Sequence, residues 1–297
     1  MDTGWLTVFR EIAHTGSFTA AAHELGYTQS AVSRQIAALE ADVGATLFDR
    51  GARGVRLTEA GRYLLTHADA VLDRLSVARD DLAALRAQAV GRLRVGSFAT
   101  AGAALVPGAI STLLAERPGV EIRHRDGLTR ELVTQVIDGA LDVAVIAGYP
   151  DRIAALPAVR LRLLCEEPVL VALPAGHRLA GRRTIRLSDL ANEVWIAGSA
   201  SPGETLIRAT LRQGFAPRIG WVVKEWTGKL GFVAAGLGIT LVPALGATGT
   251  RPDVVLVGLR PQDTPMRQIH VATAGEPTGL VRRFVDALAD RITGMGL

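Results

Sequence analysis

Three short helical segments with clear start and stop signals occupy the first 45 residues, and they constrain the fold more than any other feature. After an amphipathic first segment, Ser17 can cap a second helix over 18–24. Gly26 suits the left-handed residue that ends a helix, and Thr28 can cap a third helix over 29–42. Two helices joined by so tight a turn are typical of a helix-turn-helix.

The third segment has two different faces. Its apolar residues recur at the spacing of a buried helix face: Val32, Ile36, Leu39 and Val43. Near its start, the opposite face carries polar side chains: Thr28, Gln29, Ser30, Ser33 and Arg34. In the major groove an amide side chain suits adenine and a guanidinium group suits guanine. A merely solvated helix face would show the same pattern, so this helix alone does not establish DNA binding.

A glycine-rich segment over 47–58 predicts a short β-hairpin beside that helix. Its arginines recur at every third position: Arg50, Arg53 and Arg56. The guanidinium group is a weakly hydrated fork of donors, so it suits phosphate and minor-groove contacts. The hairpin therefore predicts a DNA-binding wing.

The overall charge is a poor argument for DNA binding. The chain has a net charge of +4, but residues 1–60 contain five arginines and seven acidic residues. The basic excess therefore lies elsewhere, and the case depends on where individual arginines are placed. A non-specific architectural DNA binder, which depends on bulk charge, is disfavoured by this acidic balance.

Taken together, these residues resemble the LysR-type transcriptional regulators. The resemblance spans the whole unit without a gap and rests on these runs: Gly16-Ser17-Phe18-Thr19-Ala20-Ala21, Leu25, Gln29-Ser30-Ala31-Val32-Ser33-Arg34-Gln35-Ile36, Leu39-Glu40, Val43-Gly44, Leu47-Phe48-Asp49-Arg50 and Leu57-Thr58-Glu59-Ala60-Gly61. The resemblance implies that Gln29, Ser30, Ser33 and Arg34 contact bases or phosphates, and that Arg53 belongs to the wing. RNA polymerase is a further candidate partner.

A proline-free stretch after Thr58 predicts one long helix over 59–90. Its apolar residues step by three or four: Leu65, Ala68, Leu72, Leu75, Ala78, Leu82, Leu85 and Ala89. Such a seam suits contact with a second copy, although packing against the same chain would give the same pattern. The resemblance implies a dimerising linker, in a homodimer or homotetramer that binds double-stranded operator DNA.

From residue 91 strands and helices alternate, which predicts an α/β fold with parallel βαβ units. We expect strands at 93–96, 120–124, 141–146, 169–173, 194–196, 219–223, 238–242 and 268–274, and helices at 100–117, 129–138, 204–212, 226–235 and 278–291. The last strand and helix can return to the first sheet. The resemblance implies a winged helix-turn-helix at 1–58, a linker helix at 59–90 and a periplasmic-binding-protein-like effector domain at 91–297, with lobe I at about 91–160 and 268–297 and lobe II at about 161–267.

Ligands of open α/β sheets bind at the carboxyl ends of strands, where helix N-termini present free N–H groups to anions. By this rule a cleft is lined from both lobes, with tryptophan as an apolar wall: Ser97, Phe98, Thr100, Leu128, Thr129, Trp195, Ser199, Ser201 and Trp226. Helix capping explains the serines and threonines equally well. The converging helix N-termini favour a small carboxylate as the effector.

Residue patterns for catalysis or metal binding are missing from the sequence. There is no Gly-x-Ser-x-Gly elbow, no Gly-x-Gly-x-x-Gly loop and no His-Glu-x-x-His pair. The single cysteine, Cys165, lies in an apolar run and predicts a buried thiol rather than a redox centre. Glu166-Glu167 before Pro168 predicts a solvated turn. We therefore expect no enzyme activity, cofactor or metal.

Neither a signal peptide nor a run of about 18 apolar residues is present, so we expect a cytoplasmic protein without a membrane partner. The leading hypothesis is a transcription regulator that responds to a small molecule. The competing one is a cytosolic small-molecule-binding protein or enzyme of the same periplasmic-binding-protein-like fold, with a non-regulatory amino-terminal domain.

Overall fold

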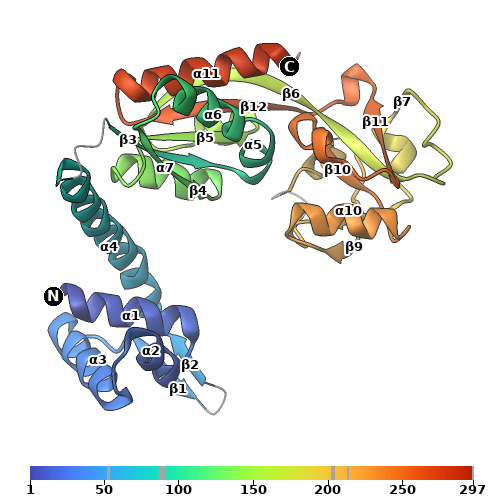
Figure 1. Cartoon of the computed structure of the whole chain (residues 1–297). Helices are drawn as coiled ribbons and strands as arrows, with labels where there is room; N and C mark the ends of the chain where they lie inside the picture. Colours follow the sequence, from blue (N-terminus) through green and yellow to red (C-terminus); the bar gives the residue numbers. More distant parts are fainter. Residues whose placement is uncertain (52–53, 87–90, 202–204, 213, 296–297) are drawn as a thin grey trace. The chain divides into compact units, whose positions relative to one another are not determined.

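The computed structural model describes the chain apart from residues 52–53, 87–90, 202–204, 213 and 296–297 (Figure 1). It contains two compact units, Met1–Gln88 with Asp138–Ala140, and Ala89–Ile137 with Leu141–Leu297. Each unit has its own hydrophobic core and is described separately below.

The smaller unit is helical with one hairpin, as predicted. Its elements are α1 (Thr3–Thr15), α2 (Phe18–Leu25), α3 (Gln29–Val43), β1 (Phe48–Gly51), β2 (Gly54–Leu57) and α4 (Glu59–Arg86). The expected signals begin and end these helices. The Ser17 hydroxyl accepts a hydrogen bond from Ala20 N–H, the Thr28 hydroxyl accepts one from Ala31 N–H, and Gly26 has φ of +68°.

Aromatic rings at the centre of this unit fix the hairpin against the helices. Phe48 of β1 lies with its ring centroid 5.3 Å from that of Phe9 and 5.7 Å from that of Phe18. The predicted apolar face of α3 is buried against the same core, with Val32, Ile36 and Leu39 at most 1% exposed. The polar face of α3 is therefore turned outward.

The apolar residues along the long helix α4 have two different environments. Leu65, Ala68 and Leu72 pack against the core of their own unit, so the intrachain explanation holds for this part of the seam. Further along, Leu75 is exposed. The side chains of Leu82 and Leu85, and all of Ala89, lie outside the described residues.

In the larger unit, lobe I contains a sheet with helices on its faces (Figure 1). Its elements are β3 (Arg92–Ser97), α5 (Ala99–Ala104), α6 (Val106–Glu116), β4 (Glu121–Asp126), α7 (Thr129–Ile137), β5 (Val143–Gly148), α8 (Pro150–Ala154), the first part of β6 (Arg160–Pro174), β12 (Met266–Thr273) and α11 (Gly279–Met295). The expected single helix after Ser97 is divided at Leu105. Pro107, which has no N–H, lies in the first turn of α6.

Lobe II contains the remaining elements. They are β7 (Thr184–Ile185), η1 (Leu187–Leu190), β8 (Val194–Ala197), α9 (Arg208–Arg212), β9 (Arg218–Val222), α10 (Trp226–Ala234), β10 (Thr240–Pro243), η3 (Ala244–Gly249), β11 (Val254–Leu259) and η4 (Pro261–Asp263). Where the sequence predicted a helix over 204–212, the structure has helix only over Arg208–Arg212, and residue 204 lies outside the described part.

The sheet is mixed, so the expectation of parallel units is only partly correct. β3 pairs in parallel with β4 and with β5, but β12 is antiparallel to both β5 and β6. The predicted return of the last strand to the first sheet is confirmed by the β12–β5 pairing. β6 has 15 residues, of which only 169–173 were expected, and it serves both lobes. Residues up to Pro168 pair with β12, and Val169 onward pair with β10 and β11.

Candidate nucleic-acid interface and candidate effector site

The polar face at the start of α3 is exposed and internally ordered. Gln29 donates a hydrogen bond from Nε2 to the Ser33 hydroxyl at 3.0 Å, and the hydroxyls of Thr28 and Ser30 are 3.1 Å apart. Arg34 is exposed on the same helix. The predicted residues of α3 therefore lie together on one outward surface and present amide, hydroxyl and guanidinium groups.

A half-buried carboxylate contact holds the hairpin next to this helix. Glu40, near the end of α3, accepts hydrogen bonds at Oε1 from Leu47 N–H at 2.7 Å and from Phe48 N–H at 3.4 Å. At the other end of the hairpin, Thr58 donates from its hydroxyl to the Thr46 carbonyl at 2.8 Å. The start and end of the wing are thus fixed to the helical core.

Of the three arginines predicted for the wing, the structure describes the side chain of Arg56. Arg56 is exposed on β2, directly across the ladder from Asp49. Arg53 lies outside the described residues, as does the side chain of Arg50.

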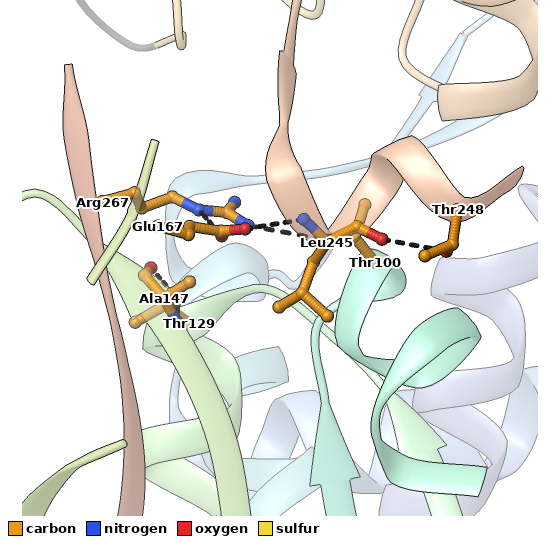
Figure 2. Close-up of polar contacts among 7 residues, drawn as sticks. All are labelled: Thr100, Thr129, Ala147, Glu167, Leu245, Thr248 and Arg267. Atoms are coloured by element: carbon orange, nitrogen blue, oxygen red, sulfur yellow. Dashed lines mark hydrogen bonds and ion pairs between the residues drawn. The ribbon is translucent and has the colours of Figure 1, made fainter. Parts of the chain in front are cut away.

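In the larger unit, an ion pair lies where the strand partner of β6 changes. Glu167 of β6 is fully buried, and Arg267 of β12 is its direct cross-strand partner. Arg267 donates to Glu167 Oε1 from Nε at 2.7 Å and also from a terminal nitrogen. The second carboxylate oxygen of Glu167 accepts from Leu245 N–H at 2.9 Å (Figure 2). The expected solvated turn at 166–167 is therefore wrong, because the ladder with β12 encloses Glu167.

Residues of both lobes meet at this pair. Leu245, from η3 of lobe II, packs into the core of lobe I. From lobe I, the Thr100 hydroxyl lies 3.4 Å from an Arg267 nitrogen, and the Arg267 guanidinium carbon lies 4.8 Å from the centre of the Phe98 ring. Phe98 and Thr100, predicted as effector residues, are thus brought to the junction of the lobes.

Trp226 of lobe II also approaches the junction of the lobes, next to Gly246 of η3. A Cβ atom at Gly246 would lie 3.2 Å from Trp226 Cζ2 and 3.4 Å from Thr100 Cγ2. A side chain at Gly246 would therefore crowd both the Thr100 methyl group and the Trp226 ring. Thr100 and Trp226, each predicted as an effector residue, thus both approach Gly246 although they come from different lobes.

Thr129 has a structural contact of its own. Its hydroxyl donates to the Ala147 carbonyl at 2.8 Å and lies 3.3 Å from Ala147 N, so it ties the start of α7 to β5 (Figure 2). The neighbouring Leu128 is 71% exposed.

Two predicted effector residues are enclosed instead. Ser97 is fully buried, and its hydroxyl lies 2.8 Å from His124 Nε2, which occupies the position a ligand would need. Trp195 is also fully buried, in the core of lobe II, so it cannot form an open aromatic wall here. On the short strand β8 it lies between Ile219 of β9, its ladder partner, and Ile239, to which it is bridged.

The loop after β8 carries the other predicted serines. Ser199 is partly buried and Ser201 is exposed, and Ser201 N–H donates to the Ser199 hydroxyl at 3.1 Å. Lys229 of α10 reaches this loop. Its Nζ would lie 3.3 Å from a Cβ atom at Gly198, and it lies 5.8 Å from the centre of the Trp226 ring. Burial lowers the pKa of the Lys229 ammonium group, while attraction to Glu225 opposes that shift.

A second set of contacts joins the lobes. Arg208 of α9 forms an ion pair with Asp151 of α8 at 2.7 Å, and its guanidinium carbon lies 4.9 Å from the centre of the Tyr149 ring. The Tyr149 hydroxyl donates to the Leu206 carbonyl at 3.3 Å. The first contact is charged and the second is neutral, and both link lobe I to lobe II.

The thiol of Cys165 is buried and is not activated for chemistry in this structure. Burial raises the pKa of the Cys165 thiol to about 11, with a smaller contribution from the charge of Glu167. Such a thiol is a poor nucleophile at neutral pH. Among the described residues no group of three or more potential metal ligands is gathered, and no described helix could cross a membrane.

The sequence did not indicate Glu167, Arg267 or Lys229 as site residues. Glu167 and Arg267 are 100 residues apart, and only the strand pairing brings them together. Lys229 had one available signal, since the chain has only two lysines, at 224 and 229.

Comparisons with known proteins agree with this architecture. Residues 3–62 match the family model for the bacterial regulatory helix-turn-helix protein, lysR family, and residues 86–293 match the LysR substrate binding domain. The HTH-type transcriptional regulator ShiR of Corynebacterium glutamicum (strain R) is 32% identical over 98% of this chain and 97% of its own length. A probable hydrogen peroxide-inducible genes activator of Mycobacterium avium is 34% identical over 80% of this chain and 76% of its own.

A solved structure shows a relative on its target. Full-length CbnR in complex with its target DNA is similar over 98% of this chain and 99% of that chain, with 25% identity and a TM-score of 0.71. The two family models together cover most of the sequence. The first falls within the smaller unit, and nearly all of the second falls within the larger one. The chain therefore belongs to the LysR family of DNA-binding transcriptional regulators, which combine a helix-turn-helix with an effector-binding domain.

Proposed function

We propose that this regulator acts in the cytoplasm and changes its operator binding when a small carboxylate binds between lobes I and II. The observation that carries the proposal is the meeting of Thr100, Trp226 and the Glu167–Arg267 pair, which come from both lobes. A ligand bound there would have different contacts in each relative position of the lobes, and only such a difference can shift a conformational equilibrium. Thr100, Thr129, Ser199 and Trp226 are the residues we propose for ligand contact.

For DNA we propose the exposed start of α3, with Gln29, Ser33 and Arg34 directed to base edges and Arg56 to the backbone. The protein would bind as a dimer or tetramer, and the exposed Leu75 on α4 supports contact with a second copy. The mycobacterial relative is named as a probable activator of hydrogen peroxide-inducible genes, but a response to peroxide through a reactive thiol is not favoured for this chain. The one thiol of this chain is buried and its pKa is raised to about 11.

A thermal-shift screen of small aliphatic and aromatic carboxylates, each paired with its uncharged amide, tests the ligand class. We expect one or more carboxylates to raise the melting temperature of the full chain and their amides to leave it unchanged, because binding to the native state stabilises it. The matched variant is Thr100→Val, which keeps the shape at the junction and removes the hydroxyl. Stabilisation by neutral or cationic compounds alone would contradict the proposal.

A further inference from the structure

Two cationic side chains belong to the proposed site, Arg267 beside Thr100 and Lys229 beside Trp226, and they differ in what surrounds them. Arg267 already faces a carboxylate, because Glu167 accepts two hydrogen bonds from it and is itself buried. A second anion at Arg267 would have to displace Glu167 from a buried position or lie beside its negative charge. Arg267 is therefore poorly suited to be the counter-ion of an anionic ligand.

Lys229 is in the opposite situation. No residue in the described part of the chain accepts a hydrogen bond from its ammonium group or forms an ion pair with it. Its near neighbours are the Trp226 ring at 5.8 Å and the backbone at Gly198, while the charge of Glu225 attracts it without forming a hydrogen bond or ion pair between the described atoms. A partly dehydrated ammonium group without an acceptor is unfavourable. An arriving carboxylate would supply charge-assisted hydrogen bonds that the protein itself does not.

The helix that carries Lys229 offers further N–H donors at its start. The nine-residue helix α10 begins at Trp226, and the residue before it, Glu225, makes no side-chain capping hydrogen bond. The first N–H groups of a helix have no partner within the helix and favour negative charge. The ammonium group of Lys229 and the uncapped start of α10 are thus on the same segment, next to an aromatic ring.

We propose that Lys229 selects the ligand of this regulator by binding its carboxylate group, with the apolar or aromatic body of the ligand against Trp226. This inference rests on the proposed function and names the residue and the ligand chemistry of that site. The Glu167–Arg267 pair, in which the two charges face each other, is then not the counter-ion of the ligand. Thr100, which is also in lobe I, lies beside this pair.

The amine itself can report binding, because Lys224 and Lys229 are the only lysines. Lys224 is exposed in the same lobe and serves as an internal standard. Reductive methylation of the full chain, followed by mass spectrometry of the two lysine peptides, is run with the carboxylates of the screen, including benzoate and succinate, and with their amides. We expect a carboxylate to slow the methylation of Lys229 by about tenfold and to leave Lys224 unchanged. Unchanged methylation of Lys229 with every carboxylate overturns the inference.

Variants separate this inference from the proposed function. Lys229→Met keeps the length of the side chain and removes its charge, Lys229→Arg restores a cation, and Lys224→Met is the matched control. Carboxylate affinity is measured by thermal shift. We expect it to fall about tenfold or more in Lys229→Met, to recover partly in Lys229→Arg and to be unchanged in Lys224→Met. Equal stabilisation of wild type and Lys229→Met would overturn the role of Lys229 and leave the proposed ligand site intact. If no carboxylate stabilises the wild type, both fail.

Discussion

Arg267 and His270 lie three residues apart on β12 and show two different outcomes of burying an ionisable side chain. Arg267 has an ion-pair partner, because Glu167 faces it directly across the ladder. His270 is 8% exposed, and its Nδ1 has no hydrogen-bond partner among the described residues. Burial consequently lowers the pKa of His270, because no neighbouring group supports the charged ring.

The lowered pKa of His270 makes a prediction about acid stability. Below its ordinary pKa of 6.5 the unfolded chain takes up a proton that the native chain does not, so stability falls as pH falls through that value. We expect the melting temperature to drop less between pH 7.5 and 5.5 in His270→Phe than in wild type. His23→Gln, at an exposed site, should behave as wild type. An identical pH profile for wild type and His270→Phe would show that His270 does not contribute.

The elements of the smaller unit were predictable because their signals are local. Ser17, Thr28 and Gly26 begin and end helices through contacts with residues a few positions away, and the structure has those contacts. The first part of β6 was not predictable in this way. Arg160 and Arg162 are exposed there, and Glu167 is buried only because β12 returns from a distant part of the chain. Local pattern could therefore define α3 and its polar face, but not the ion pair at the junction of the lobes.

At the scale of the elements, α3 and the hairpin should make separable contributions to DNA binding. We expect Arg34→Ala to weaken binding to the specific operator by about 1–3 kcal/mol, because its guanidinium group would lose a base contact. Arg56→Ala should lower the affinity for all sequences more evenly, because a phosphate contact carries no sequence information. Fluorescence anisotropy with the intergenic DNA upstream of the gene and with random DNA measures both. If neither variant changes specific binding, the proposed DNA face is wrong.

Within the larger unit, the two lobes are joined by side chains as well as by strands. The ion pair of Arg208 and Asp151 and the hydrogen bond from Tyr149 to Leu206 both cross from one lobe to the other. An ion pair open to solvent contributes little to overall stability, typically about 0–1 kcal/mol. We expect the ion pair instead to restrict the motion of lobe I relative to lobe II.

Hydrogen exchange can detect this effect. We expect Arg208→Ala to increase amide exchange in α8 of lobe I as well as in α9 of lobe II, with little change in melting temperature. Arg251→Ala is the matched control, because Arg251 pairs with Asp253 within lobe II alone. Unchanged protection of α8 in Arg208→Ala would mean that the ion pair does not restrain the lobes.

Pro168 occupies the position at which β6 leaves one ladder for the next, since it is opposite Met266 of β12 while Val169 is opposite Pro243 of β10. Proline has no N–H, so this residue donates nothing to either ladder. Elsewhere in the strand a change of backbone angle would strain or break a ladder hydrogen bond, but at Pro168 there is no donor to lose. The pyrrolidine ring also fixes φ of Pro168, so ψ is the backbone angle that stays free at this residue, directly beside the buried carboxylate of Glu167. A small change of ψ at Pro168 would rotate the part of β6 that pairs with β10 and β11 relative to the part that pairs with β12.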